Sequence, residues 1–221
     1  YGDARRTQLI NIEPPKGEEI EIANVEPEKC VVVMSEGGLI KRIPASSFRT
    51  QRRNGKGVKT ANDINAAVIR TNTIDSLMIF TNQGRMYRIL VDNIPSGTNS
   101  TKGVPVQSLI TMEPNEVPAL MYSIYRDTDA KYVFFATKNG TVKKTSLEEY
   151  VKTKRKTGVA AINLREGDAL ASVNLIKDED IVMLTKNGMA IRFGSNEVAA
   201  SSRATIGIKG IELKSDDEVV S

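Results

Sequence analysis

The chain has 221 residues, of which 40% are hydrophobic and 26% charged, and its formal net charge is +4. It contains no histidine and a single cysteine, Cys30, which excludes Ser-His-Asp triads, Cys-His dyads, classical metal sites and disulfide frameworks within the chain. The lone cysteine fits a reducing compartment, and no apolar run approaches the roughly 18 residues of a membrane-spanning helix. We therefore expect a cytoplasmic globular protein with one large domain or two smaller ones.

The charges are segregated along the chain, although their sum is small. Residues 8–30 hold six acidic side chains against two lysines, whereas residues 131–160 hold eight basic side chains against Glu148 and Glu149. This distribution predicts one basic surface on an otherwise more acidic molecule.

Taken in order, the chain opens with a polar linker at residues 1–7 and two strand-like runs at residues 8–13 and 19–23. The apolar run that contains Cys30 follows, and there we expect a buried, inert thiol. From this point a unit recurs, made of an apolar strand, a turn that ends in glycine, and a second strand with one or two cations. Its four copies are residues 31–42, 77–88, 132–144 and 181–192.

A second glycine marks each unit, and we call it the landmark glycine. It follows the hairpin glycine by 19, 19, 18 and 19 residues in the pairs Gly38–Gly57, Gly84–Gly103, Gly140–Gly158 and Gly188–Gly207. A period of about 40–50 residues with several short strands in each unit is typical of propeller-like blades. The sequence therefore predicts an all-β domain over residues 8–221 with at least four repeats, whose cores lie at about 31–58, 77–104, 132–159 and 181–211.

A polar loop precedes each landmark glycine, and the first is the most basic. Residues 51–57 contain three cations and two glycines, and residues 41–60 contain no acidic side chain. Glycine lets a backbone approach a ligand closely, while Arg and Lys supply charge-assisted donors that suit phosphate. If the units are arranged radially, equivalent loops lie at equivalent positions, so their cations form one continuous basic rim.

No catalytic motif accompanies these loops. The sequence has no GxxxxGK[ST] phosphate loop, and no GxGxxG follows a strand and opens a helix. Tyr87, Tyr122 and Tyr132 fall in apolar strand patterns, where packing rather than nucleophilic attack is expected. We therefore predict no catalytic, metal or cofactor site in this chain.

Four segments, at residues 1–7, 38–42, 51–57 and 207–211, resemble parts of one known family, the C-terminal domain of the DNA gyrase A subunit. Residues 51–57 are similar to its GyrA box, QRRGGKG, and differ only at Asn54. Residues 38–42 resemble the family's G-Y-I-K-R, residues 207–211 its G-V-R-G-I, and residues 1–7 the FGDxRRT segment that precedes the domain. The resemblance covers essentially the whole chain.

This resemblance implies a β-pinwheel, a propeller-like disc whose neighbouring blades exchange strands and whose basic rim bends and wraps duplex DNA. It also implies a bacterial, chromosome-associated parent enzyme that uses ATP and Mg²⁺, with an N-terminal breakage-reunion region and an ATPase B subunit in an A2B2 holoenzyme. The topoisomerase IV A subunit is the close relative and stays an alternative, although an intact box favours gyrase. A propeller-like adaptor that binds acidic proteins is the alternative from another class.

The expected DNA contacts are backbone contacts, which position the duplex without reading its sequence. Arg52, Arg53 and Lys56 are expected to bind phosphates, within a box completed by Gln51, Gly55 and Gly57. The path is expected to continue over cations in or near the other loops and on the first hairpin, namely Lys41, Arg42, Arg49, Lys102, Lys154, Arg155, Lys156 and Arg203.

Overall fold

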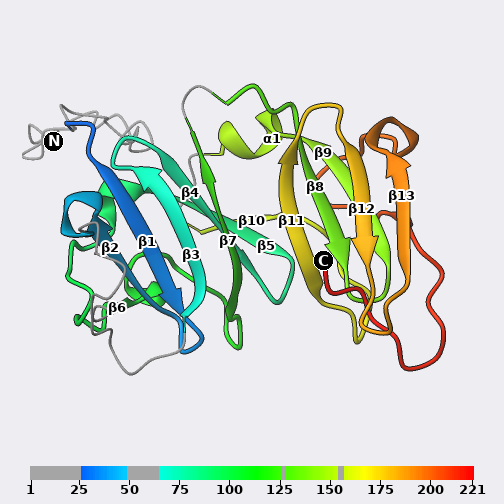
Figure 1. Cartoon of the computed structure of the whole chain (residues 1–221), viewed down its shortest axis with the longest axis horizontal. Coiled ribbons are helices and arrows are strands. Elements are labelled where there is room, and N and C mark those ends of the chain that lie inside the picture. Colours follow the sequence, from blue (N-terminus) through cyan, green and yellow to red (C-terminus); the bar gives the residue numbers. More distant parts are fainter. Residues whose placement is uncertain (1–25, 49–64, 126–127, 154–156) are drawn as a thin grey trace, which may run out of the picture.

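The computed structural model describes residues 26–48, 65–125, 128–153 and 157–221. These residues form antiparallel sheets with short helical turns between them, so the all-β prediction is confirmed (Figure 1). Each sheet is built on one of the four predicted hairpins, and we call it a blade. Figure 1 shows the blades side by side in chain order along the long axis of the molecule.

The first three blades have four strands each. Blade 1 has the strand order β3-β1-β2-β6, blade 2 the order β10-β5-β4-β7, and blade 3 the order β11-β8-β9-β14. Their bounds are β1 Lys29–Ser35, β2 Leu39–Pro44, β3 Asn65–Asn72, β4 Ser76–Thr81, β5 Arg85–Leu90, β6 Val104–Pro105, β7 Pro118–Ile124, β8 Tyr132–Thr137, β9 Thr141–Ser146, β10 Val159–Ala160, β11 Leu170–Ile176 and β14 Ile208–Lys209.

Blade 4 consists of β12 (Asp180–Leu184) and β13 (Ala190–Gly194), and residues 218–221 lie beside β12 through backbone hydrogen bonds. Short helical segments connect the strands. They are α1 (Glu148–Val151) and the 3₁₀ turns η1 (Ala45–Ser47), η2 (Val91–Asn93), η3 (Val106–Ser108) and η4 (Ser195–Glu197). No helix in the described ranges has the length and apolar character to cross a membrane.

Neighbouring units exchange strands. The short strand after each described landmark glycine leaves its own unit and pairs with the second hairpin strand of the preceding blade, as β6 does with β2 and β14 with β9. In the same way β10, which follows Gly158, pairs with β5 of blade 2. Each of the first three blades is therefore completed by the unit that follows it in the chain.

The core lies between the blades, and this explains the apolar strands. Successive side chains of a strand point to opposite faces. Along β4, Leu77 and Ile79 pack in the core against blade 1, while Met78 and Phe80 pack against blade 3. A strand that is buried on both faces needs an unbroken apolar run, which the sequence shows.

Blade 4 differs, because only one face of β12 is covered within the described residues. Met183 is buried against blade 3, whereas Val182 and Leu184 on the other face are 55% and 45% exposed. Cys30, in contrast, is buried as predicted, and burial raises the pKa of its thiol to about 11. The thiol therefore stays protonated at neutral pH, in agreement with an inert structural role.

Candidate nucleic-acid interface

Two rim loops are described in full, and each docks on the preceding blade in the same way. We call residues 95–103 rim loop 2 and residues 200–207 rim loop 4, after their units. The amide of Arg42 donates to the carbonyl of Pro95 over 3.1 Å, and the amide of Gly97 donates to the carbonyl of Arg42 over 2.8 Å. In rim loop 4 the amide of Ser201 donates to the carbonyl of Lys144 over 2.8 Å.

The landmark glycines bring both loops close to the preceding blade. Gly103 has φ +95° and Gly207 has φ +103°, a backbone region that side chains disfavour. A Cβ on Gly103 would lie 2.6 Å from the carbonyl oxygen of Ile40, and one on Gly207 would lie 2.4 Å from that of Val142. Ile40 and Val142 each lie two residues after a hairpin glycine. The two loops thus lie at equivalent places on their blades, as the repeat predicted.

Most of the predicted DNA contacts cannot be placed on this interface, because they lie outside the described residues. This set comprises the box residues Gln51, Arg52, Arg53, Gly55, Lys56 and Gly57, together with Arg49, Lys154, Arg155 and Lys156. Four predicted contacts remain within the described residues, namely Lys41, Arg42, Lys102 and Arg203.

Lys41 and Arg42 are more enclosed than the sequence suggested. Lys41 is 7% exposed, and burial lowers its pKa. The guanidinium of Arg42 donates through Nε to the carbonyl of Ile94 over 3.2 Å and lies 3.3 Å from Asp92. Unit 2 covers both side chains, and its carbonyls and Asp92 bind their charged groups.

Lys102 and Arg203 lie in the two rim loops and remain accessible. Lys102 is exposed next to its landmark glycine. The Arg203 side chain is about one third exposed, and its Nε lies 3.6 Å from a carboxylate oxygen of Glu149. These two side chains are therefore the described members of the predicted set that can meet a phosphate.

Arg85 is a further cation at this edge, and the sequence analysis missed it. It lines an open hollow of about 550 Å³ together with Arg203, Ser202 and Glu149. Its guanidinium donates to the carbonyl of Thr157 over 2.7 Å and lies 3.7 Å from Glu116. One feature of the sequence could have indicated Arg85. Among the four units, only unit 2 has a cation directly after its hairpin glycine.

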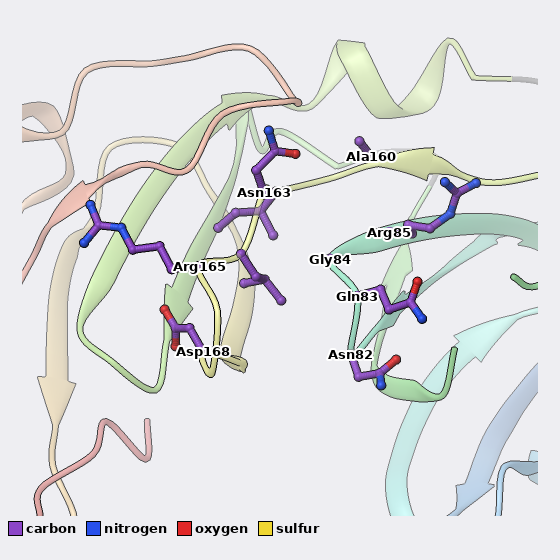
Figure 2. A pocket seen from close by; sticks show the side chains of 10 residues that line it. Asn82, Gln83, Gly84, Arg85, Ala160, Asn163, Arg165 and Asp168 are labelled. Atoms are coloured by element: carbon purple, nitrogen blue, oxygen red, sulfur yellow. The ribbon is translucent and has the colours of Figure 1, made fainter. Parts of the chain in front are cut away.

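Figure 2 shows a second hollow beside Arg85, with a volume of about 560 Å³. The turn of the β4–β5 hairpin forms one wall, and the segment after β10 forms the other. Its lining is polar and of mixed charge, with Arg85 on the hairpin wall and Arg165 and Asp168 on the opposite wall. The labelled residues are Asn82, Gln83, Gly84, Arg85, Ala160, Asn163, Arg165 and Asp168. No cluster of Cys, Asp or Glu in the described residues could hold a metal ion.

Comparison with known proteins identifies the fold. The family described as "DNA gyrase C-terminal domain, beta-propeller" matches residues 31–66, 75–116, 131–177 and 179–221. The chain belongs to this family. The four matched segments each contain one of the four hairpins, and the matches cover most of the chain.

Relatives of the gyrase C-terminal family support the assignment over the full chain. The chain is 35% identical over its whole length to the DNA gyrase A protein of Mycolicibacterium smegmatis and 36% identical over 95% of its length to that of Clostridium acetobutylicum. It spans only 27% and 25% of these two relatives.

Solved structures confirm the β-pinwheel architecture. A DNA gyrase A C-terminal domain matches with a TM-score of 0.72 and 26% identity, covering 88% of this chain and 64% of that one. The C-terminal domain of a DNA topoisomerase IV matches with a TM-score of 0.70 and 29% identity, covering 89% and 61%. The resemblance read from residues 51–57 is therefore confirmed at the level of family and fold.

Proposed function

We propose that this gyrase C-terminal domain binds duplex DNA along its rim without reading sequence, bends it and wraps it. The wrapped duplex would present a neighbouring segment for strand passage by the parent type IIA topoisomerase, and the wrapping would give negative supercoiling. The observation that carries the proposal is the equivalent docking of rim loops 2 and 4, which brings a loop with a cation to the same place on blade 1 and on blade 3.

Among the described residues, the proposed contacts are Lys102 and Arg203, with Arg85 lining the same hollow as Arg203. The box cations Arg52, Arg53 and Lys56 join them by their place in the repeat. We leave out Lys41 and Arg42, because unit 2 covers most of their side chains as well as binding their charged groups. Smoothly bending 20–30 base pairs through 40–90° costs on the order of 1–6 kcal/mol, and counterion release at several phosphates can offset it.

The remaining chemistry belongs to the parent enzyme. We propose that this chain contributes no catalytic residue and no ATP or Mg²⁺ site, and that it acts with an N-terminal breakage-reunion region and an ATPase B subunit in the bacterial cytoplasm. The curated relatives named above, both gyrase A proteins of which this chain spans about a quarter, are consistent with such a division of labour.

Replacing Arg52, Arg53 and Lys56 by Ala in the full-length parent protein tests this proposal. We expect wrapping and ATP-dependent supercoiling to be lost, while relaxation of supercoiled plasmid by the holoenzyme is largely kept, because strand passage does not depend on the rim. The measurement is plasmid topology after incubation with each holoenzyme. Unchanged wrapping in the triple variant would refute the role given to the box.

Topoisomerase IV stays the second candidate, since its C-terminal domain matches this chain almost as well as that of gyrase does. The same assay separates the two. A gyrase introduces negative supercoils into relaxed plasmid, whereas decatenation without supercoiling would assign the chain to topoisomerase IV.

A further inference from the structure

Two lysines occupy the same position in their units and are both buried. Lys41 and Lys143 lie three residues after the hairpin glycines Gly38 and Gly140, and they are 7% and 1% exposed. Neither forms an ion pair with a carboxylate of the described residues. A buried ammonium is costly unless its donors are satisfied, so its surroundings must supply acceptors at defined positions.

Backbone carbonyls supply these acceptors, and the following unit contributes at least one of them to each lysine. The Nζ of Lys41 donates to the carbonyls of Thr98, Asn99 and Thr101 over 3.2, 3.0 and 2.6 Å. The Nζ of Lys143 donates to the carbonyl of Arg203 and, over 2.6 Å, to that of Ala161. Each ammonium thus binds the backbone of the rim loop that docks on its blade.

Both lysines also donate to a carbonyl at the same position of the following unit. Asn99 lies four residues before the landmark glycine Gly103, and Arg203 lies four residues before Gly207. Independent surface contacts would have no reason to coincide in this way. The coincidence indicates a repeated device that fixes the backbone of the rim loop at one point.

We propose that Lys41 and Lys143 are positioning residues of the DNA-binding rim. Each holds the rim loop of the following unit by its carbonyls and so orients the cation of that loop, which is Lys102 in one case and Arg203 in the other. The orientation of a cation toward DNA rests on the proposed function, whereas the binding of the loop carbonyls by each lysine does not. The lysines touch no DNA themselves.

Residues of α1 next to Lys143 connect its hydrogen bonds to the side chain of Arg203. The hydroxyl of Tyr150 shares the carbonyl of Ala161 with the ammonium, over 3.0 Å. Glu149, the neighbour of Tyr150, accepts from the amide of Arg203 over 3.3 Å and lies 3.6 Å from its Nε. Lys143 therefore fixes the backbone of Arg203, while α1 holds its side chain.

Blade 2 provides a matched control. Its equivalent residue is Tyr87, whose hydroxyl donates to Glu116 over 2.6 Å, within its own unit. Tyr87→Phe removes a buried hydrogen bond at the same position of the repeat without touching rim loops 2 and 4. It therefore reports the effect of a general loss of stability on these loops.

Amide hydrogen exchange on the full chain, without DNA, tests the hold on the loops. We expect Lys41→Met to raise exchange in rim loop 2 by about tenfold and to leave rim loop 4 unchanged, because charge-assisted hydrogen bonds are lost in one loop only. Lys143→Met should do the reverse, and Tyr87→Phe should change neither. The proposal would be overturned if either Met variant raised exchange equally in both loops, or if it raised exchange in neither loop. If Lys143→Met does not fold, the less buried Lys41 still gives the full comparison.

DNA binding tests the orienting role. Lys41→Met should weaken binding of random-sequence duplex about as much as Lys102→Ala, and should lower the salt slope by roughly 0.9, one phosphate contact, although its own ammonium is enclosed. The double variant should bind no worse than Lys102→Ala alone. Additive losses would overturn the orienting role. If the wild-type chain binds no DNA at low salt, the proposed function fails, and the exchange experiment alone still decides whether the lysines hold the loops.

Discussion

At the scale of single residues, lysine occurs in two contrasting environments in this domain. Lys102 is exposed and free to meet phosphate, whereas Lys143 is 1% exposed and bound to carbonyls. Burial lowers the pKa of Lys143 from 10.5 to about 8; Glu149 opposes this shift, and Arg203 adds to it. The ammonium is therefore kept in the fold at a cost that its hydrogen bonds must offset.

This cost predicts a pH dependence of stability. Between pH 8 and 10.5 the unfolded chain keeps the Lys143 proton that the folded chain releases, so the contribution of this group to the free energy of unfolding rises with pH in that window. Above pH 10.5 the deprotonation of Lys143 adds about 3 kcal/mol to the free energy of unfolding. Below pH 8 it adds nothing, because Lys143 is protonated in both the folded and the unfolded chain.

Denaturant unfolding of the wild type and Lys143→Met from pH 7 to 11 measures this contribution. The difference between the two proteins isolates Lys143 from Cys30, whose raised pKa acts with the opposite sign. Parallel pH profiles for the two proteins would contradict a lowered pKa.

At the scale of elements, the landmark glycine makes strand exchange possible. Its positive φ turns the chain, and its missing side chain lets the following strand approach the preceding blade. At Gly207 an added Cβ would meet the carbonyl of Val142 at 2.4 Å and displace β14 from β9. At Gly188, φ is similarly positive at +81°, but no described atom lies within 4 Å of an added Cβ.

This contrast gives a matched pair of variants. Gly188→Ala should cost about 1 kcal/mol of unfolding free energy from backbone strain, whereas Gly207→Ala should cost about 3 kcal/mol because the loop must also move. Denaturant titration of both variants measures the difference. Equal costs would mean that the close approach at Gly207 is not needed for the pairing of β14.

At the scale of the whole molecule, strand exchange brings rim loops 2 and 4 onto the blades that precede them, and we propose that such loops together form one DNA-binding interface. Each of the two fully described rim loops is held by backbone hydrogen bonds to the blade of the preceding unit and not only by its own unit. Affinity for DNA should therefore depend on several phosphate contacts at once.

A salt titration of the wild-type chain with random-sequence duplex checks this expectation. Because log affinity falls by roughly 0.9 per contact for each decade of salt, binding through six or more contacts should weaken by about a thousandfold between 50 and 200 mM salt. A flat titration would exclude the rim mechanism and favour an adaptor for acidic proteins.

Local features of the sequence determined the all-β class, the four hairpins, the buried Cys30 and the repeat, and the box at residues 51–57 identified the family. These are properties of short segments, since turn glycines and apolar runs record local backbone geometry and burial. The alternation within β4 became clear only when its two faces were found in different cores.

Only the tertiary structure decided which cations face solvent and which are buried. Lys41 and Lys102 look alike in sequence, yet Lys41 is covered by carbonyls 57, 58 and 60 residues away along the chain. The residues that flank Lys41 in the sequence do not show that a loop of the next unit will cover it. The hydrophobic pattern therefore determined the blades, whereas strand exchange between blades determined which of their charges are covered and which face solvent.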